Sequence, residues 1–146
     1  MASKEDLDKT YMRMAEQLSQ LSKAQRKKVG ALIVKGTQII SEGYNGTPSG
    51  FDNECERVNH LDEIYTKQEV LHAESNAITK LARSTNSSDR STLYVTLAPC
   101  FDCSKLIIQS GIERVVYKEQ YHSNGLAFLS KAGIEVNCIY DYDNKP

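Results

Sequence analysis

The chain has 146 residues, a length that fits one core of ordinary size, and we expect a single domain over residues 1–146. Its 18 Lys and Arg nearly balance its 19 Asp and Glu, which argues against tight polynucleotide binding because that depends on a basic surface. A cytoplasmic location is favoured, because the sequence has no apolar run of membrane-spanning length, no signal-peptide stretch and no disulfide-like spacing of its four cysteines.

The first elements predicted along the chain are an amphipathic helix and a pair of strands. Ser3 is a suitable N-cap, with Asp6 three residues further on. The predicted apolar face of this helix consists of Leu7, Tyr11, Met14, Ala15, Leu18 and Leu21. Residues 29–35 and 38–43 read as strands that turn around Gly36, which predicts a β-hairpin.

The rest of the chain alternates helices with short strands after a long irregular connection over residues 45–69. Connections of this length inside one domain are more often functional than accidental. We predict helices at 73–83, 101–110 and 125–132, strands at 92–97, 114–117 and 134–140, and a solvated loop at 84–91. This alternation implies right-handed crossovers onto a partly parallel sheet.

Two short motifs carry the chemistry of the sequence. His72 and Glu74 form His-x-Glu, and Cys100 and Cys103 form Pro-Cys-x-x-Cys with Pro99. Two thiolates and one imidazole suit zinc, and three protein ligands leave the fourth position for water, as in catalytic sites. Together the motifs are the signature of zinc-dependent nucleobase deaminases. A structural zinc site is the weaker alternative, because no fourth ligand has sensible spacing and Glu74 would have no role.

The spacing of these residues constrains where the two helices begin. Cys100 and Cys103 are three residues apart, so both sulfurs face the same way on the first turn of a helix, which Pro99 can enter without losing a hydrogen bond. His72 and Glu74 are two residues apart and would point to opposite sides of a regular helix. Both reach one centre only if the helix begins at His72 or Ala73.

The chemistry expected from this set is hydrolytic. Zinc lowers the pKa of bound water to about 7, and Glu74 is placed to accept that proton and to pass protons to the ring nitrogen and the departing ammonia. The attacked atom is the amine-bearing carbon of a cytosine or adenine ring.

Four further segments carry a family resemblance: residues 28–31 (KVGA), 43–50 (GYNGTPSG), 72–78 (HAESNAI) and 106–112 (LIIQSGI). From about residue 26 to residue 136 the chain resembles the deoxycytidylate (dCMP) deaminase family of the cytidine deaminase-like superfamily. The resemblance implies an α/β fold of three layers, α/β/α, with a five-stranded mixed sheet and the element order α-β-β-α-β-α-β-α-β. It also implies that the protein converts dCMP to dUMP for thymidylate synthesis. Members of this family are homo-oligomers, often hexamers, and the resemblance implies activation by dCTP and inhibition by dTTP, each with or without bound Mg²⁺.

The resemblance also implies roles for individual residues. His72, Cys100 and Cys103 would bind one catalytic Zn²⁺ per subunit, and Glu74 would be the proton shuttle. Asn45 would bind the deoxyribose 3′-hydroxyl and Tyr121 the phosphate.

Two basic residues and one loop are less specific candidates. Arg26 and Lys28 are apt partners for a phosphate dianion, although a solvated basic turn explains them equally well. The loop of Gly43, Tyr44, Asn45, Gly46, Thr47, Pro48, Ser49 and Gly50 can form a backbone cradle for an effector triphosphate. Without the resemblance, this loop would be interpreted as an ordinary turn.

The sequence departs from some family members over residues 51–69. This segment is shorter than in members that hold a second, structural zinc ion there. Cys55 and His60 are the remaining candidate ligands, and two ligands do not make a site, so we expect a surface thiol and a loop histidine instead.

Other functions remain open at this stage. One is a different deaminase of the superfamily, acting on a nucleoside, on tRNA or DNA, or on both dCMP and dCTP. The near-neutral charge and the absence of Trp disfavour polynucleotide editing. A catalytically silent zinc fold, serving assembly or nucleotide sensing, is a further alternative, and the intact Glu74 argues against it.

Overall fold

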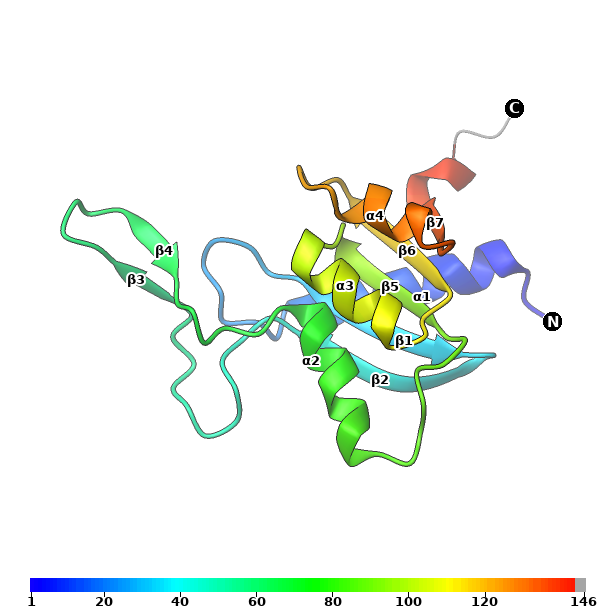
Figure 1. The fold of residues 1–146 in the computed structure, drawn as a ribbon, viewed down its shortest axis with the longest axis horizontal. Coiled ribbons are helices and arrows are strands. Elements are labelled where there is room, and N and C mark those ends of the chain that lie inside the picture. Colours follow the sequence, from blue (N-terminus) through cyan, green and yellow to red (C-terminus); the bar gives the residue numbers. More distant parts are fainter. Residues whose placement is uncertain (144–146) are drawn as a thin grey trace.

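The computed structural model describes residues 1–143, which form a five-stranded mixed sheet with helices on both faces (Figure 1). The strands are β1 (Gly30–Lys35), β2 (Gln38–Tyr44), β5 (Thr92–Leu97), β6 (Arg114–Glu119) and β7 (Glu135–Cys138), in the order β2-β1-β5-β6-β7. β1 runs antiparallel to both of its neighbours, whereas β5, β6 and β7 are parallel. The predicted mixed sheet is confirmed.

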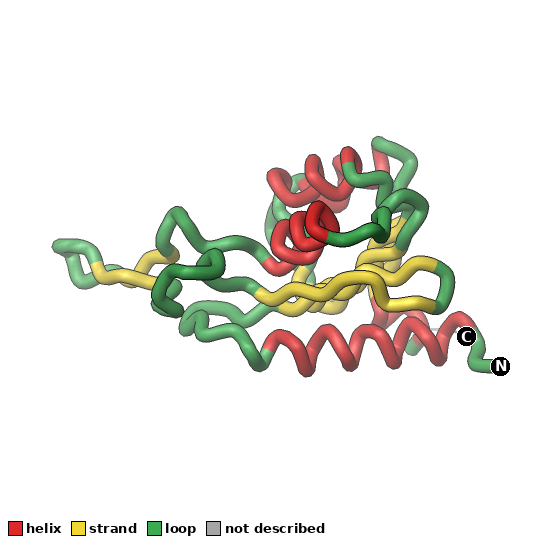
Figure 2. The backbone as a smooth tube through the Cα atoms, turned by 90° about the horizontal axis from the view of Figure 1, so that it is seen from below, coloured by secondary structure: helices red, strands yellow, loops and turns green. Residues whose placement is uncertain are grey.

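The helices form one layer on each side of this sheet (Figure 2). α1 (Lys4–Ser19) covers one face, and α2 (Ala73–Lys80), α3 (Phe101–Gln109) and α4 (Gly125–Lys131) cover the other. Alternate side chains of β1 serve the two layers: Leu32 and Val34 pack with α1, whereas Ala31 and Ile33 pack with the other three helices. The predicted three-layer arrangement is therefore confirmed.

Some predicted element ends differ from the structure. The predicted helix over 73–83 finishes as a 3₁₀ helix, η1 (Leu81–Arg83). The predicted strand over 134–140 stops at Cys138, where a second 3₁₀ helix, η2 (Ile139–Tyr142), begins. The Asp141 carboxylate accepts a hydrogen bond from the Cys138 backbone N–H at 3.2 Å and so ends the strand. Within residues 1–143, no helix is long and apolar enough to cross a bilayer.

The connection over residues 45–69, predicted to be irregular, contains a second, two-stranded sheet. β3 (Glu56–Val58) and β4 (Ile64–Thr66) pair antiparallel and project from the body of the molecule (Figure 1). We call residues 51–69 the arm. Its turn is held by Asn59, whose side-chain oxygen accepts backbone N–H bonds from Leu61 and Glu63. The sequence lacks a strand pattern here because both faces of this short hairpin are largely exposed.

The predicted apolar face of α1 is partly wrong. Met14 and Leu21 are exposed, whereas the buried α1 residues are Asp8, Tyr11, Met12, Ala15 and Ser19. A charged residue therefore occupies a core position that the apolar pattern could not assign. Its burial is possible because partners from distant parts of the chain surround it.

Asp8 is the centre of a buried polar network that ties both ends of the chain to the sheet. The Arg114 guanidinium binds both carboxylate oxygens, at 2.9 and 2.6 Å. The hydroxyls of Tyr94 and Tyr142 each donate to the carboxylate at 2.5 Å. Burial by itself raises the pKa of Asp8, but the hydrogen bonds from Arg114, Tyr142 and Tyr94 outweigh it and lower the pKa below its usual value.

We predict that Asp8→Asn lowers the free energy of unfolding by about 3–5 kcal/mol, because the buried Arg114 loses its counter-charge. The stability that Asp8 contributes is present above the pKa of an unfolded aspartate, about 3.9, and is lost as the pH falls through the lower folded-state pKa. Urea unfolding of the wild type, Asp8→Asn and the exposed-site control Asp6→Asn between pH 7 and pH 3 measures both effects. An Asp8→Asn variant as stable as Asp6→Asn would contradict this.

Candidate active site

His72 stands at the entrance of α2, as its predicted role requires. It is the N-cap residue, with extended backbone angles (φ −73°, ψ 156°), and the helix begins at Ala73. This backbone geometry lets His72 and Glu74 line the same cavity although they are two residues apart. The helix itself lies close against β2, because a Cβ on Gly43 would come within 2.6 Å of the Ala73 carbonyl oxygen.

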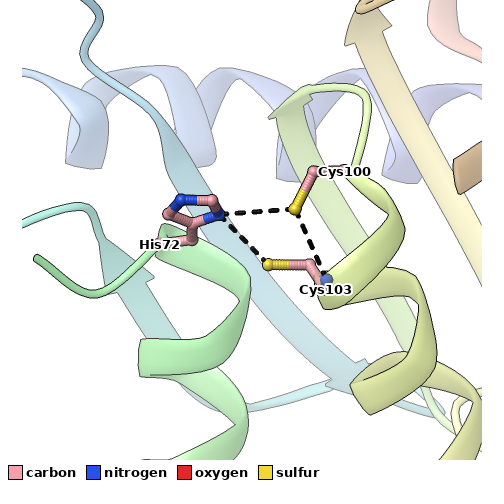
Figure 3. Close-up of side chains that lie close together, drawn as sticks. All are labelled: His72, Cys100 and Cys103. Carbon is pink, nitrogen blue, oxygen red and sulfur yellow. Dashed lines mark hydrogen bonds between the residues drawn. The ribbon is translucent and has the colours of Figure 1, made fainter. Parts of the chain in front are cut away.

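The two cysteines lie at the entrance of α3. Cys100 is the N-cap, and its Sγ accepts the backbone N–H of Cys103 at 3.4 Å. Pro99 precedes this N-cap, so it lies outside the helix turn in which we expected it. Both sulfurs face the His72 ring, with Nδ1 at 3.6 Å from Sγ of Cys100 and 3.3 Å from Sγ of Cys103 (Figure 3).

These three donor atoms fit a tetrahedral zinc ion. They all lie within 4.8 Å of one another. Zn–S bonds of about 2.3 Å and Zn–N bonds of about 2.0 Å place neighbouring tetrahedral ligands roughly 3.5 Å apart. The separations between His72 and the sulfurs match this value, and a three-ligand set leaves one position for a small molecule.

The three groups shift one another's pKa values because they lie so close together. Hydrogen bonds from Cys103 and His72 lower the pKa of Cys100 to about 4. The bond to Cys100 and burial raise the pKa of Cys103, and the bond to Cys100 raises the pKa of His72. The thiolate is the form of cysteine that binds a metal, and the lowered pKa of Cys100 favours that form.

Glu74 lies beside this cluster and is 4% exposed. Burial raises the pKa of its carboxyl group, against the opposing effects of a backbone hydrogen bond and of His72. A raised pKa makes a carboxyl group a better proton acceptor, and the group can return the proton later in a reaction. Its position beside the ligand candidates is the one required of a proton carrier.

The cluster opens into a cavity of about 300 Å³. Of the residues singled out in the sequence, Arg26, Asn45 and Tyr121 line this cavity together with His72, Glu74 and Cys100. Lys28 is not brought to it and lines a neighbouring depression. Its neighbour Lys27 lines the cavity instead. Within a run of three basic residues, the sequence could not decide which of them border the cavity.

The arm contributes a wall of the cavity that sequence reasoning missed. Cys55, Glu56 and Thr66 all line it. Cys55 is 1% exposed, so the expectation of a surface thiol is wrong, while His60 lies in the exposed turn of the arm. Only the length of the 45–69 connection indicated that this segment has a function.

A second cavity, of about 470 Å³, borders the loop that follows β2. The loop residues Tyr44, Asn45, Gly46, Thr47, Pro48, Ser49 and Gly50 line it. Gly43 does not, because it packs under α2. Lys23 and Lys80 add positive charge to this cavity. Asn45 and Cys55 line both cavities and therefore form part of the wall between them.

Comparison with known proteins agrees with this geometry. Residues 5–119 match the family model of the cytidine and deoxycytidylate deaminase zinc-binding region. The deoxycytidylate deaminase of Enterobacteria phage T4 is 36% identical over 87% of this chain and 86% of the phage protein, and the human deoxycytidylate deaminase is 38% identical over 83% and 70%. The crystal structure of dCMP deaminase from cyanophage S-TIM5 in complex with dCMP and dUMP superimposes with a TM-score of 0.86 and 43% identity, covering 94% of this chain and 99% of that one. The chain belongs to the cytidine and deoxycytidylate deaminase family.

Proposed function

We propose that this protein is a zinc-dependent dCMP deaminase that converts dCMP and water into dUMP and ammonia, and so supplies dUMP for thymidylate synthesis. One observation carries the proposal. His72, Cys100 and Cys103 converge at ligand distance, and the buried Glu74 lines one cavity together with His72, Cys100 and Arg26. The solved S-TIM5 structure, which holds dCMP and dUMP, supports the choice of substrate.

In this reaction Glu74 moves the protons. Zinc held by His72, Cys100 and Cys103 would supply water acidified to a pKa of about 7. Glu74 would accept one proton of that water as the oxygen adds to the amine-bearing ring carbon, and would pass it to the ring nitrogen. It would then accept the second proton from the new hydroxyl group and pass it to the amine, which leaves as ammonia. The raised pKa of Glu74 suits a group that must bind and release a proton in each turnover.

We predict that Glu74→Gln keeps zinc and the fold but loses about 10²–10⁴-fold in turnover, because the amide cannot shuttle protons. Cys103→Ser should instead lose the metal, because the hydroxyl is a poor replacement for a thiolate ligand. Elemental analysis of both purified variants, with dCMP turnover measured on the same samples, separates the two roles. Near-normal turnover by zinc-loaded Glu74→Gln would exclude Glu74 as the shuttle.

We propose that the cavity binds the nucleotide. Arg26 and Tyr121, which line it, would bind the 5′-phosphate, and Lys28 would contribute from the neighbouring depression that it shares with Arg26. Asn45 is the candidate partner of the 3′-hydroxyl. Its side-chain amide already binds Val29 and Lys27, and one N–H and one lone pair remain for the sugar.

We predict that Arg26→Ala lowers kcat/KM for dCMP by about ten- to a hundredfold, because a hydrogen bond to a charged group is lost. Any turnover of deoxycytidine, which has no phosphate, should change little. Tyr121→Phe should act in the same direction. Lys35→Ala, which removes a charge at the far end of β1, serves as the matched control. Equal losses for dCMP and deoxycytidine would show that Arg26 does not bind the phosphate.

We propose that dCTP and dTTP, with or without Mg²⁺, bind in the second cavity and regulate the enzyme in opposite directions. The loop of residues 44–50, Lys23 and Lys80 would meet the triphosphate there. Asn45 and Cys55, shared by the two cavities, provide the physical contact through which an effector can act.

We predict that dTTP weakens and dCTP strengthens dCMP use by about 5–150-fold, the usual range of coupling between sites. Saturation curves for dCMP at increasing concentrations of each effector measure this, and each effector should displace the other. If millimolar dTTP leaves the dCMP curve unchanged, the loop is an ordinary turn.

We propose that the protein assembles into a homo-oligomer, a hexamer, and that the arm forms part of the contact surface between subunits. The arm exposes apolar side chains of Phe51, Val58, Leu61, Ile64 and Tyr65. Its six carboxylates outnumber Arg57 and Lys67, while the rest of the chain has an excess of basic residues, so a second copy complements its charge.

We predict that the wild type sediments as an oligomer, and that Val58→Asp or Leu61→Asp shifts it toward smaller species, because a charge is placed in an apolar contact. Thr10→Asp on the exposed face of α1 is the control. Sedimentation velocity at several protein concentrations gives the result. An unchanged distribution for both arm variants would place the contact elsewhere.

A further inference from the structure

Residues 22–29 join α1 to β1 without helix or strand, yet they form one wall of the active-site cavity. Ala24, Arg26, Lys27 and Val29 of this segment all line the cavity. A wall without helical or ladder hydrogen bonds takes its position from the side chains that bind its backbone. The bonds to this segment therefore decide where Arg26 stands.

Asn45, at the end of β2, supplies several of these bonds. Its side-chain oxygen accepts the backbone N–H of Val29 at 2.9 Å, and its amide donates to the Lys27 carbonyl at 2.8 Å. Its backbone N–H donates to the Val29 carbonyl at 3.2 Å. The C-terminal end of the segment is thus fixed to the sheet.

Ser22 provides the corresponding attachment at the other end. Its hydroxyl donates to the Asn45 carbonyl at 2.8 Å and accepts the Ala24 backbone N–H at 3.2 Å. The residue is 1% exposed, and it lines neither the active-site cavity nor the second cavity. Between the two ends, one Glu56 oxygen accepts the backbone N–H groups of Gln25 and Arg26 at 2.8 and 3.2 Å.

We propose that Ser22 is a positioning residue for substrate binding: its buried hydroxyl joins the 22–29 segment to Asn45 and so holds Arg26 at the cavity. The proposal rests on the proposed role of Arg26 at the phosphate. Without the hydroxyl, the Asn45 carbonyl and the Ala24 N–H each lose a hydrogen-bond partner. The backbone that carries Arg26 then loses its attachment at the Ser22 end of the segment. The chemistry at Glu74 and the metal ligands does not depend on this attachment.

The test compares Ser22→Ala with a matched control, Ser41→Ala. Ser41 is also a buried serine, 5% exposed, and its hydroxyl donates to the Ala77 carbonyl at 2.6 Å, away from the 22–29 segment. Ser22→Ala loses two hydrogen bonds and Ser41→Ala loses one, so both variants should lose thermal stability, and Ser22→Ala should lose more. Ser22→Ala should raise KM for dCMP about three- to tenfold with kcat within about twofold, whereas Ser41→Ala should change neither.

The outcomes separate this inference from the proposed phosphate site. If Ser22→Ala matches Ser41→Ala while Arg26→Ala raises KM, the positioning role is overturned and the phosphate site stands. If Arg26→Ala leaves KM unchanged, the phosphate site fails and the inference fails with it. A Ser22→Ala variant that loses kcat with KM unchanged also overturns the inference. Should Ser22→Ala not fold, Ser22→Cys, which fills similar space with a weak donor, carries the same expectation.

Discussion

The distance between the entrances of α2 and α3 is the constraint on which the site depends. His72 holds the N-cap position of one helix and Cys100 that of the other, so the three candidate ligands come together only if both helices begin close to one another above the sheet. Two close contacts fix that point. α2 lies directly on β2 at Gly43, and a Cβ on Gly125 of α4 would come within 2.2 Å of the Pro99 carbonyl oxygen. Larger residues at these two positions would move the helices that carry the ligands.

The cavity is assembled from segments with different kinds of support. Its floor, with His72, Glu74 and Cys100, rests on helices packed against the buried strands. Its other walls come from the 22–29 segment and the arm, and side-chain hydrogen bonds from Asn45 and from the arm residue Glu56 hold the 22–29 segment. Rigid support under the reacting groups and lighter support around the substrate suit an enzyme that must admit and release a nucleotide.

Asn45 connects the 22–29 segment with the two cavities, because its side chain and its backbone bind that segment and the residue lines both cavities. It binds the 22–29 segment, borders the active-site cavity and borders the second cavity. One residue therefore contacts the 22–29 segment and lines both cavities. The buried Cys55 also lines both cavities.

The sequence alone identified the candidate metal ligands, the candidate proton carrier and the order of the main elements. These depend on the spacing within His-x-Glu and Pro-Cys-x-x-Cys and on local periodicity, and both can be read directly from neighbouring residues in the sequence. Only the tertiary structure decided that Lys27 rather than Lys28 borders the cavity, that Asp8 is buried and that the arm forms a hairpin. Each of these depends on partners far away in the sequence: Asp8 needs Arg114, and the 22–29 segment needs Asn45. Local patterns record what a residue prefers, whereas such long-range contacts decide which preference is met.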